Sequence, residues 1–309
     1  MGCPYDGGGV GLPRRGPGWQ FASRCVSMAA VRSGYLLNGD NPLNYLEWGD
    51  ADSPPVLFLH GLTDCAYVWQ PVCERLADRY HCVALSLRGH GDSGPSPERQ
   101  YNFQLFASDV AALVQHLGWQ RFVLVGHSLG GRTSIAYASN NPQQVKALVV
   151  VDVAPGLPKE AAWRIKSNME SMPERFESWQ AAVEHLVAAR PGTPRRVIEE
   201  RAFYLLRRLP EGGATWKLDP LVRQEWLGPD LPPRATADVW GALERLQCPM
   251  LVVKGETSDT LSAELCERMV SFGRNSRWAE VPRASHWVFD DNLDGFLAVL
   301  EPFLAEHAG

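Results

Sequence analysis

The sequence lacks the features of a membrane or lipid-anchored protein. No apolar run approaches the roughly 20 residues that a transmembrane helix needs. The first 30 residues contain no central apolar stretch of the signal-peptide kind, and Asp6 stands where a myristoylation motif requires Ser or Thr. We expect no membrane association, and we predict that residues 1–30 form a disordered leader.

An excess of positive charge is also missing. The chain has 30 Lys and Arg against 35 Asp and Glu, a formal net charge of −5, and its basic residues are dispersed. Nucleic-acid-binding proteins usually gather basic residues on one face or in one segment. We therefore expect a small-molecule substrate and no nucleic-acid partner, and the sequence does not indicate an oligomeric state.

The cysteines show no pattern of disulfides or paired metal ligands. There are seven of them, an odd number, and they are scattered without CxxC spacing. Such thiols are typical of a reducing compartment, where cysteine packs as a small core residue. We expect a cytoplasmic protein.

What the sequence does contain is a regular alternation of buried strands and helices. The run Val56-Leu57-Phe58-Leu59 is wholly apolar, as is typical of a strand buried on both faces of a parallel sheet. Alternating strands and helices imply right-handed crossovers within one α/β domain. Further strands are expected at 83–85, 122–125, 147–151, 250–253 and 278–281, and helices at 72–79, 106–117, 133–139 and 296–305.

Two regions depart from this alternation. Segments 34–37 and 43–48 flank the turn residues Asn38-Gly39-Asp40 and predict an opening hairpin. Between Pro155 and about Leu243 the strand signal stops, and helical periodicity with many Arg, Glu and Trp takes over. We predict an α/β core formed by residues 31–155 and 244–309, with a helical cap, residues 156–243, inserted into it.

The first candidate catalytic motif is a nucleophile elbow, a sharp turn that carries a serine between a strand and a helix. Gly126-His127-Ser128-Leu129-Gly130 directly follows a predicted strand and precedes a predicted helix, which is the context that a Gly-x-Ser-x-Gly turn requires. The sharp turn demands very small residues two positions before and two after the serine, and both are glycine. Ser128 is the predicted nucleophile.

A serine hydroxyl needs a base and the base needs a carboxylate. His286 lies between the last predicted strand and the last helix, where a loop can reach the carboxyl edge of the sheet. Two aspartates fit the chain order of serine, acid and histidine. We favour Asp259, which follows strand 250–253, and retain Asp152, at the end of strand 147–151, as the alternative acid.

The oxyanion of a tetrahedral intermediate needs two backbone donors. One is expected from Leu129, the residue after the nucleophile. The other is expected from Leu62, because His60-Gly61-Leu62 follows the strand 56–59. We expect His60 to brace this loop through hydrogen bonds and His127 to pack.

Taken together, these motifs resemble the α/β-hydrolase family, in its capped carboxylesterase and lipase-like branch. The resemblance covers about residues 31–309. In the family an aspartate usually stands two residues before the arginine of the motif Arg88-Gly89-His90-Gly91-Asp92-Ser93; here that position is Ser86, which affects loop bracing and leaves the triad alone. The resemblance rests on segments 60–62, 88–93, 126–131, 255–259 and 286–287.

The resemblance implies a mostly parallel eight-stranded sheet with helices on both faces and an inserted helical cap. Epoxide hydrolases and haloalkane dehalogenases are similar in fold but use an aspartate nucleophile, whereas a serine attacks acyl carbon. We therefore predict hydrolysis of small to medium hydrophobic carboxylic esters through an acyl-enzyme, with no metal or organic cofactor. The alternatives are a lactonase, a carbon-carbon bond hydrolase, or a non-catalytic small-molecule receptor.

Overall fold

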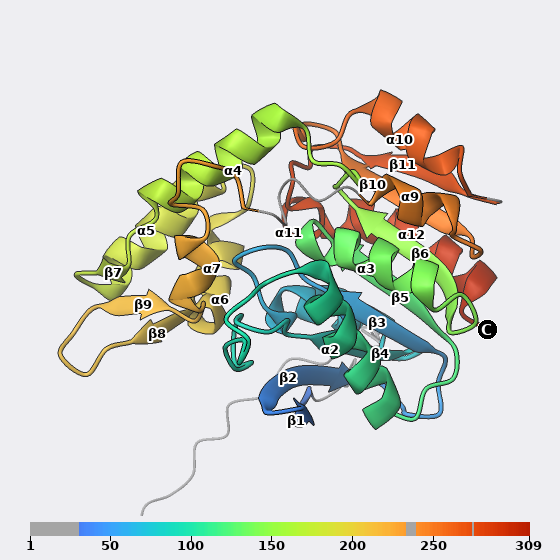
Figure 1. Cartoon of the computed structure of the whole chain (residues 1–309), viewed down its shortest axis with the longest axis horizontal. Helices are drawn as coiled ribbons and strands as arrows, with labels where there is room; N and C mark the ends of the chain where they lie inside the picture. The colour runs from blue at the N-terminus through green and yellow to red at the C-terminus, as the bar shows by residue number, and fades with distance from the viewer. Residues whose placement is uncertain (1–30, 233–238, 274) are drawn as a thin grey trace, which may run out of the picture.

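The computed structural model describes residues 31–232, 239–273 and 275–309; the predicted leader, residues 1–30, lies outside them. Its centre is an eight-stranded sheet in the order β1-β2-β4-β3-β5-β6-β10-β11, antiparallel at β1, β2 and β4 and parallel from β4 to β11 (Figure 1). The predicted sheet and the opening hairpin are confirmed. The strands are β1 (Arg32–Asn38), β2 (Asn41–Trp48), β3 (Pro55–Leu59), β4 (His81–Leu85), β5 (Phe122–His127), β6 (Val145–Val151), β10 (Met250–Gly255) and β11 (Arg277–Val281).

Helices cover both faces of this sheet because successive strand residues point to opposite sides. Leu57 and Leu59 belong to one buried cluster and Val56 and Phe58 to the other. The first face packs against α2 (Phe103–His116), α3 (Leu129–Asn140), α9 (Trp240–Glu244) and α10 (Ala263–Val270). The second packs against the 3-10 helix η1 (Ala66–Trp69), α1 (Gln70–Leu76), α11 (Val288–Asp291) and α12 (Leu293–His307).

All four predicted helices, α1, α2, α3 and α12, begin earlier than the sequence pattern predicted. Helix α2 begins at Phe103 and not at 106, because the Asn102 side chain accepts a hydrogen bond from the Leu105 N–H and caps the helix. Helix α3 begins at Leu129, directly after the serine of the elbow. Its N-terminus therefore lies at the predicted nucleophile.

The segment between β6 and β10, which we call the cap (residues 156–243), contains helices α4 (Lys159–Ser171), α5 (Trp179–Ala189), α6 (Arg195–Leu205) and α7 (Pro220–Gln224). It also contains a three-stranded antiparallel sheet that we did not predict. These strands have only two or three residues each, too few for an alternating pattern to show, and Gly212 and Gly213 turn the chain between two of them with positive φ. They are β7 (Arg175–Phe176), β8 (Leu206–Arg208) and β9 (Ala214–Trp216), on the left of Figure 1.

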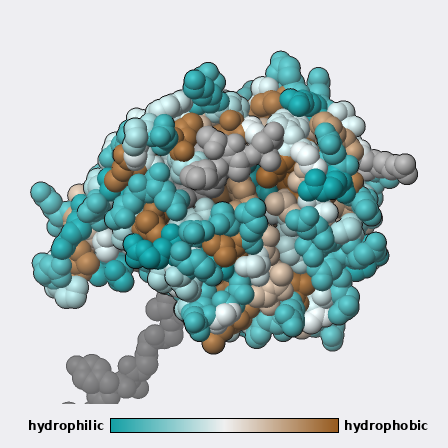
Figure 2. All heavy atoms as spheres, viewed as in Figure 1, coloured by the Kyte–Doolittle hydropathy of each residue, from teal (hydrophilic) through white to brown (hydrophobic). Residues whose placement is uncertain are grey.

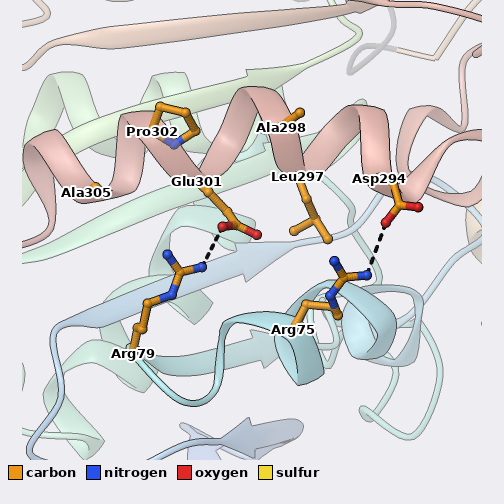
Figure 3. Close-up of a pocket in the computed structure, with 8 residues that line it drawn as sticks. All are labelled: Arg75, Arg79, Asp294, Leu297, Ala298, Glu301, Pro302 and Ala305. Carbon is orange, nitrogen blue, oxygen red and sulfur yellow. Dashed lines mark hydrogen bonds and ion pairs between the residues drawn. The ribbon is translucent and has the colours of Figure 1, made fainter.

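The surface shows apolar residues only in small, separated patches on the face drawn in Figure 2. No helix in the described ranges is both long enough and apolar enough to span a bilayer. A shallow groove between α1 and α12 is crossed by the ion pairs Arg75–Asp294 (3.1 Å) and Arg79–Glu301 (2.7 Å) (Figure 3). None of the predicted site residues lines it, and the two ion pairs link α12 to α1 and to the turn that follows α1.

Candidate active site

Ser128 occupies a strained turn between β5 and α3. Its φ of 52° and ψ of −114° lie outside the regions that residues with a side chain usually adopt. A Cβ built on Gly126 would lie 2.4 Å from the Gly130 carbonyl oxygen, and one built on Gly130 would lie 2.4 Å from the Leu59 carbonyl oxygen. The geometry confirms that both flanking positions must be glycine.

The structure brings Ser128 and His286 together. The His286 Nε2 lies 3.1 Å from the Ser128 Oγ, and its Nδ1 lies 2.8 Å from the Asp152 Oδ2. The Asp152 side chain is fully buried, whereas the imidazole of His286 keeps 22% of its surface exposed. A hydroxyl, an imidazole and a carboxylate therefore form one continuous hydrogen-bonded chain.

The preference for Asp259 as the acid was wrong. Its carboxylate points outward, is 68% exposed, and pairs with Arg164 of the cap at 2.9 Å. The alternative, Asp152, contacts His286 because β6 is the direct neighbour of β5 in the sheet, whereas β10 lies one strand further away. Asp152 follows β6 with a φ of 51°, and its N–H donates to the Val253 carbonyl.

Two further groups bind the Asp152 carboxylate. The Gly255 N–H donates to Oδ1 at 2.9 Å, and the Ser258 hydroxyl donates to Oδ2 at 2.5 Å. The segment 255–259, in which we expected the acid itself, instead supplies two donors to the acid, the Gly255 amide and the Ser258 hydroxyl. No motif in the sequence pointed to Ser258.

His127 is buried beside the predicted base and is neutral. Its Nε2–H donates to the carbonyl oxygen of His286 at 2.8 Å. Burial, with the neighbouring His286 as a smaller contribution, lowers the pKa of His127 to about 3. His127 therefore holds the backbone of His286 in place across the elbow, a role beyond the packing that we predicted.

The predicted oxyanion loop lies against the nucleophile. A Cβ built on Gly61 would lie 3.2 Å from the Cβ of Ser128. As predicted, His60 braces this loop: its Nε2 accepts from the Leu87 N–H at 2.9 Å, so its Nδ1–H donates to the Gly61 carbonyl at 2.7 Å. Burial lowers the pKa of His60 to about 4, which keeps the ring neutral.

Ser86 braces neighbouring loops, as its place in the motif suggested. Its Oγ accepts from the Ala66 N–H at 3.1 Å, and its carbonyl oxygen accepts from the Ser93 hydroxyl at 2.6 Å. Neither contact involves the triad. The departure from the family pattern is therefore a matter of loop support.

Comparison with known proteins gives the family. Residues 54–226, more than half of the chain, match the family model described as the alpha/beta hydrolase fold. This chain belongs to the α/β-hydrolase family. It is 31% identical to the 2-(acetamidomethylene)succinate hydrolase of Mesorhizobium japonicum, over 92% of this chain and 95% of that protein.

Two further comparisons support this assignment. The α/β-hydrolase described here is 29% identical to Esterase Rv0045c of Mycobacterium tuberculosis, over 74% of this chain and 76% of the relative. The crystal structure of E-2-(acetamidomethylene)succinate hydrolase superposes with a TM-score of 0.81 at 28% identity, covering 89% of this chain and 100% of the other. The chain is thus similar both to a hydrolase named for a substituted succinate and to a protein named as an esterase.

In this α/β-hydrolase, buried ion pairs tie the cap to the two loops that carry the site. Arg190, at the end of α5, pairs with Asp64 at 2.6 Å, and Asp64 closely follows the loop 60–62. Arg201 of α6 pairs with Asp290 at 2.7 Å, and Asp290 lies in α11 just after His286. All four side chains are at most 4% exposed. The sequence pattern did not reveal these pairs because their partners lie about 90 or more residues apart.

An apolar cluster of the cap reaches the oxyanion loop. Met169, Met172 and Trp226 form a buried group, against which Leu62 packs together with Leu218. Leu62 therefore packs against this cap group on one side and against the core cluster that contains Leu59 and Leu129 on the other. The immediate surroundings of the loop are hydrophobic on the cap side.

Proposed function

We propose that this α/β-hydrolase is a serine hydrolase that cleaves carboxylic esters of small to medium hydrophobic substrates through an acyl-enzyme. The observation that carries the proposal is the chain of hydrogen bonds from Ser128 through His286 to Asp152. That chain has the order and the atoms of a nucleophile, a base and an orienting acid. It argues against a receptor that only binds its ligand.

In the proposed mechanism, the His286 Nε2 takes the proton of Ser128 while the Oγ attacks the acyl carbon. Asp152 stabilises the imidazolium that forms, and the amides of Leu62 and Leu129 bind the oxyanion. Leu129 is the first residue of α3, so its N–H has no acceptor within the helix. His286 then returns the proton to the leaving alcohol, and water activated by the same ring releases the acid. Each step uses side chains and amides of this chain.

The choice of a hydrophobic ester depends on the cap. The group formed by Met169, Met172 and Trp226 covers the oxyanion loop with apolar surface, which would favour an apolar acyl or alcohol group. A relative named as an esterase supports ester cleavage. Another relative is named as a hydrolase of a substituted succinate, so a lactonase or a carbon-carbon bond hydrolase is the alternative if no ester is hydrolysed.

The test is hydrolysis of p-nitrophenyl esters from acetate to laurate at neutral pH, with wild type and Ser128→Ala measured side by side. We expect turnover by wild type, background rates for the variant, and an optimum at short to medium chains. Labelling with a fluorophosphonate reagent shows separately whether Ser128 is nucleophilic. Labelling without hydrolysis of any ester would contradict the substrate class, and absence of both would contradict the proposed function.

A further inference from the structure

We propose that Ser258 is a positioning residue that holds the carboxylate of Asp152 in the orientation that His286 requires. Ser128, His286, Asp152 and Ser258 then form one chain of hydrogen bonds. This inference rests on the proposed function, because it concerns the same triad. It adds a residue outside the elbow, histidine and acid motifs, supplied by the loop after β10.

The direction of the Ser258 hydrogen bond follows from its other contact. The Ser258 Oγ accepts a hydrogen bond from the Thr260 N–H at 3.2 Å, so its single hydroxyl proton is free to donate to Asp152 at 2.5 Å. An ionised carboxylate accepts hydrogen bonds only. Ser258 is therefore the donor and Asp152 the acceptor in this contact.

The hydrogen-bond donors are divided between the two oxygens of the Asp152 carboxylate, and this division fixes the rotation of the carboxylate. Ser258 and His286 both donate to Oδ2, while the Gly255 N–H donates to Oδ1. Without Ser258, the contact of Oδ2 with His286 is the remaining side-chain restraint on that oxygen among the described residues. Because Asp152 is fully buried, a lost donor is not simply replaced by bulk water.

The loop that carries Ser258 is fixed to the segment that carries His286. The Ser258 N–H donates to the Gly255 carbonyl at 3.0 Å. The Thr257 N–H and hydroxyl both bind the carbonyl of Ala284, two residues before His286, at 2.9 and 3.0 Å. The position of Ser258 is thus fixed relative to Gly255 and to the segment that carries His286, as a positioning residue requires.

Removing the hydroxyl leaves the Asp152 carboxylate with one donor fewer and freer to rotate. Its hydrogen bond to the His286 Nδ1–H is then expected to weaken, so Ser128 is activated less efficiently. The other titratable ring against His286 is His127, whose lowered pKa keeps it neutral over the range of interest.

The experiment compares wild type with Ser258→Ala, Ser258→Thr and Ser262→Ala. Ser262 is the matched control, because its hydroxyl oxygen caps α10 by accepting a hydrogen bond from the Leu265 N–H, a contact that does not involve Asp152. The His286 Nδ1–H resonance is followed by NMR of histidine-labelled protein. The rate of Ser128 labelling by a fluorophosphonate is measured against pH, and Tm is recorded for each variant.

We expect the His286 Nδ1–H resonance of Ser258→Ala to move upfield, because the hydrogen bond to Asp152 weakens, and its labelling rate at pH 7 to fall about tenfold. Ser258→Thr should restore both, and Ser262→Ala should leave both unchanged. A lower Tm with an unchanged Nδ1–H resonance and labelling rate would overturn the proposal. If Ser258→Ala does not fold, Ser258→Cys, which keeps the volume but donates weakly, takes its place.

Failure of this inference is distinguishable from failure of the proposed function. The Nδ1–H resonance reports the hydrogen bond between His286 and Asp152 without any turnover. If no ester is hydrolysed but the resonance moves in Ser258→Ala, the positioning role stands and the substrate class falls. If esters are hydrolysed and Ser258→Ala behaves like Ser262→Ala, the proposed function stands and the role of Ser258 is withdrawn.

Discussion

The side chain of Asp152 illustrates how a single residue acquires a role from its surroundings. It is fully buried, yet hydrogen bonds from His286, Ser258 and the Gly255 amide satisfy its two oxygens. Asp259, only one residue from Ser258, faces solvent and pairs with Arg164. The two aspartates should therefore respond very differently to the same substitution.

For Asp152→Asn, we expect kcat to fall by about 10³ to 10⁴, because the amide holds the wrong tautomer of His286 and does not stabilise the imidazolium. For Asp259→Asn, an exposed site, we expect kcat within about twofold of wild type. Both are measured with the best p-nitrophenyl ester and by fluorophosphonate labelling. Equal losses in the two variants would show that Asp152 is not the acid.

The loop after β10 also allows the acid to be moved. The Ser258 Oγ lies 2.5 Å from the Asp152 Oδ2, so a carboxylate at position 258 reaches toward the space that Oδ2 occupies. We expect the double variant Asp152→Ser/Ser258→Asp to be about tenfold or more above Asp152→Ser alone in kcat, since a misplaced but present carboxylate retains part of the effect. No gain over the single variant would mean that the carboxylate at 258 does not reach His286.

Between elements, the cap is attached to the core by buried charges as well as by apolar contacts. Arg201 donates to Asp290 and to the carbonyls of Tyr67 and Val68 in η1. Removing Arg201 leaves the buried Asp290 with the longer contact to Arg190, at 3.6 Å, which is far more costly than breaking an exposed pair. The exposed pair Arg196–Glu200 lies on the same helix and offers a matched comparison.

Arg201→Met should destabilise the protein by about 3 to 5 kcal/mol, whereas Arg196→Met should cost under about 1 kcal/mol. Adding Asp290→Leu to Arg201→Met should recover part of the loss, because no unpaired charge remains. Urea denaturation at pH 7 measures all three free energies of unfolding. Similar costs for the two arginines would contradict a role for Arg201 in holding the cap.

Considered as a whole, the molecule contains neutral buried histidines that connect its stability to pH. The pKa of His60 is lowered by burial to about 4, below the ordinary value of about 6.5. The folded chain therefore binds fewer protons than the unfolded chain between these values, and stability is lost as the pH falls from about 7 toward 4. His127 acts in the same direction.

From pH 7 to pH 5, we expect His60 alone to lower the free energy of unfolding by about 2 kcal/mol. In His60→Gln, which has no titrating ring, the difference between the two pH values should shrink by about that amount, whatever the absolute stability of the variant. Urea denaturation of wild type and variant at both pH values provides the comparison. An unchanged pH dependence would show that the His60 ring is not held neutral by burial.

Local patterns predicted much of this protein. Short apolar runs identified the parallel strands, because a strand buried on both faces needs apolar residues at every position. The elbow was identified from a pentapeptide, because the strain at Ser128 and the close approach of Gly126 and Gly130 involve neighbours in the sequence. The nucleophile and the loop 60–62 follow from such local requirements.

The tertiary structure decided the rest. The order of serine, acid and histidine along the chain suited both Asp152 and Asp259, and the placement of β6 beside β5 brought Asp152 to His286. The contacts of Ser258, Arg190 and Arg201 join residues about 90 or more positions apart. No periodicity or spacing records such contacts, because they depend on which strands are neighbours and on how the cap packs over their ends.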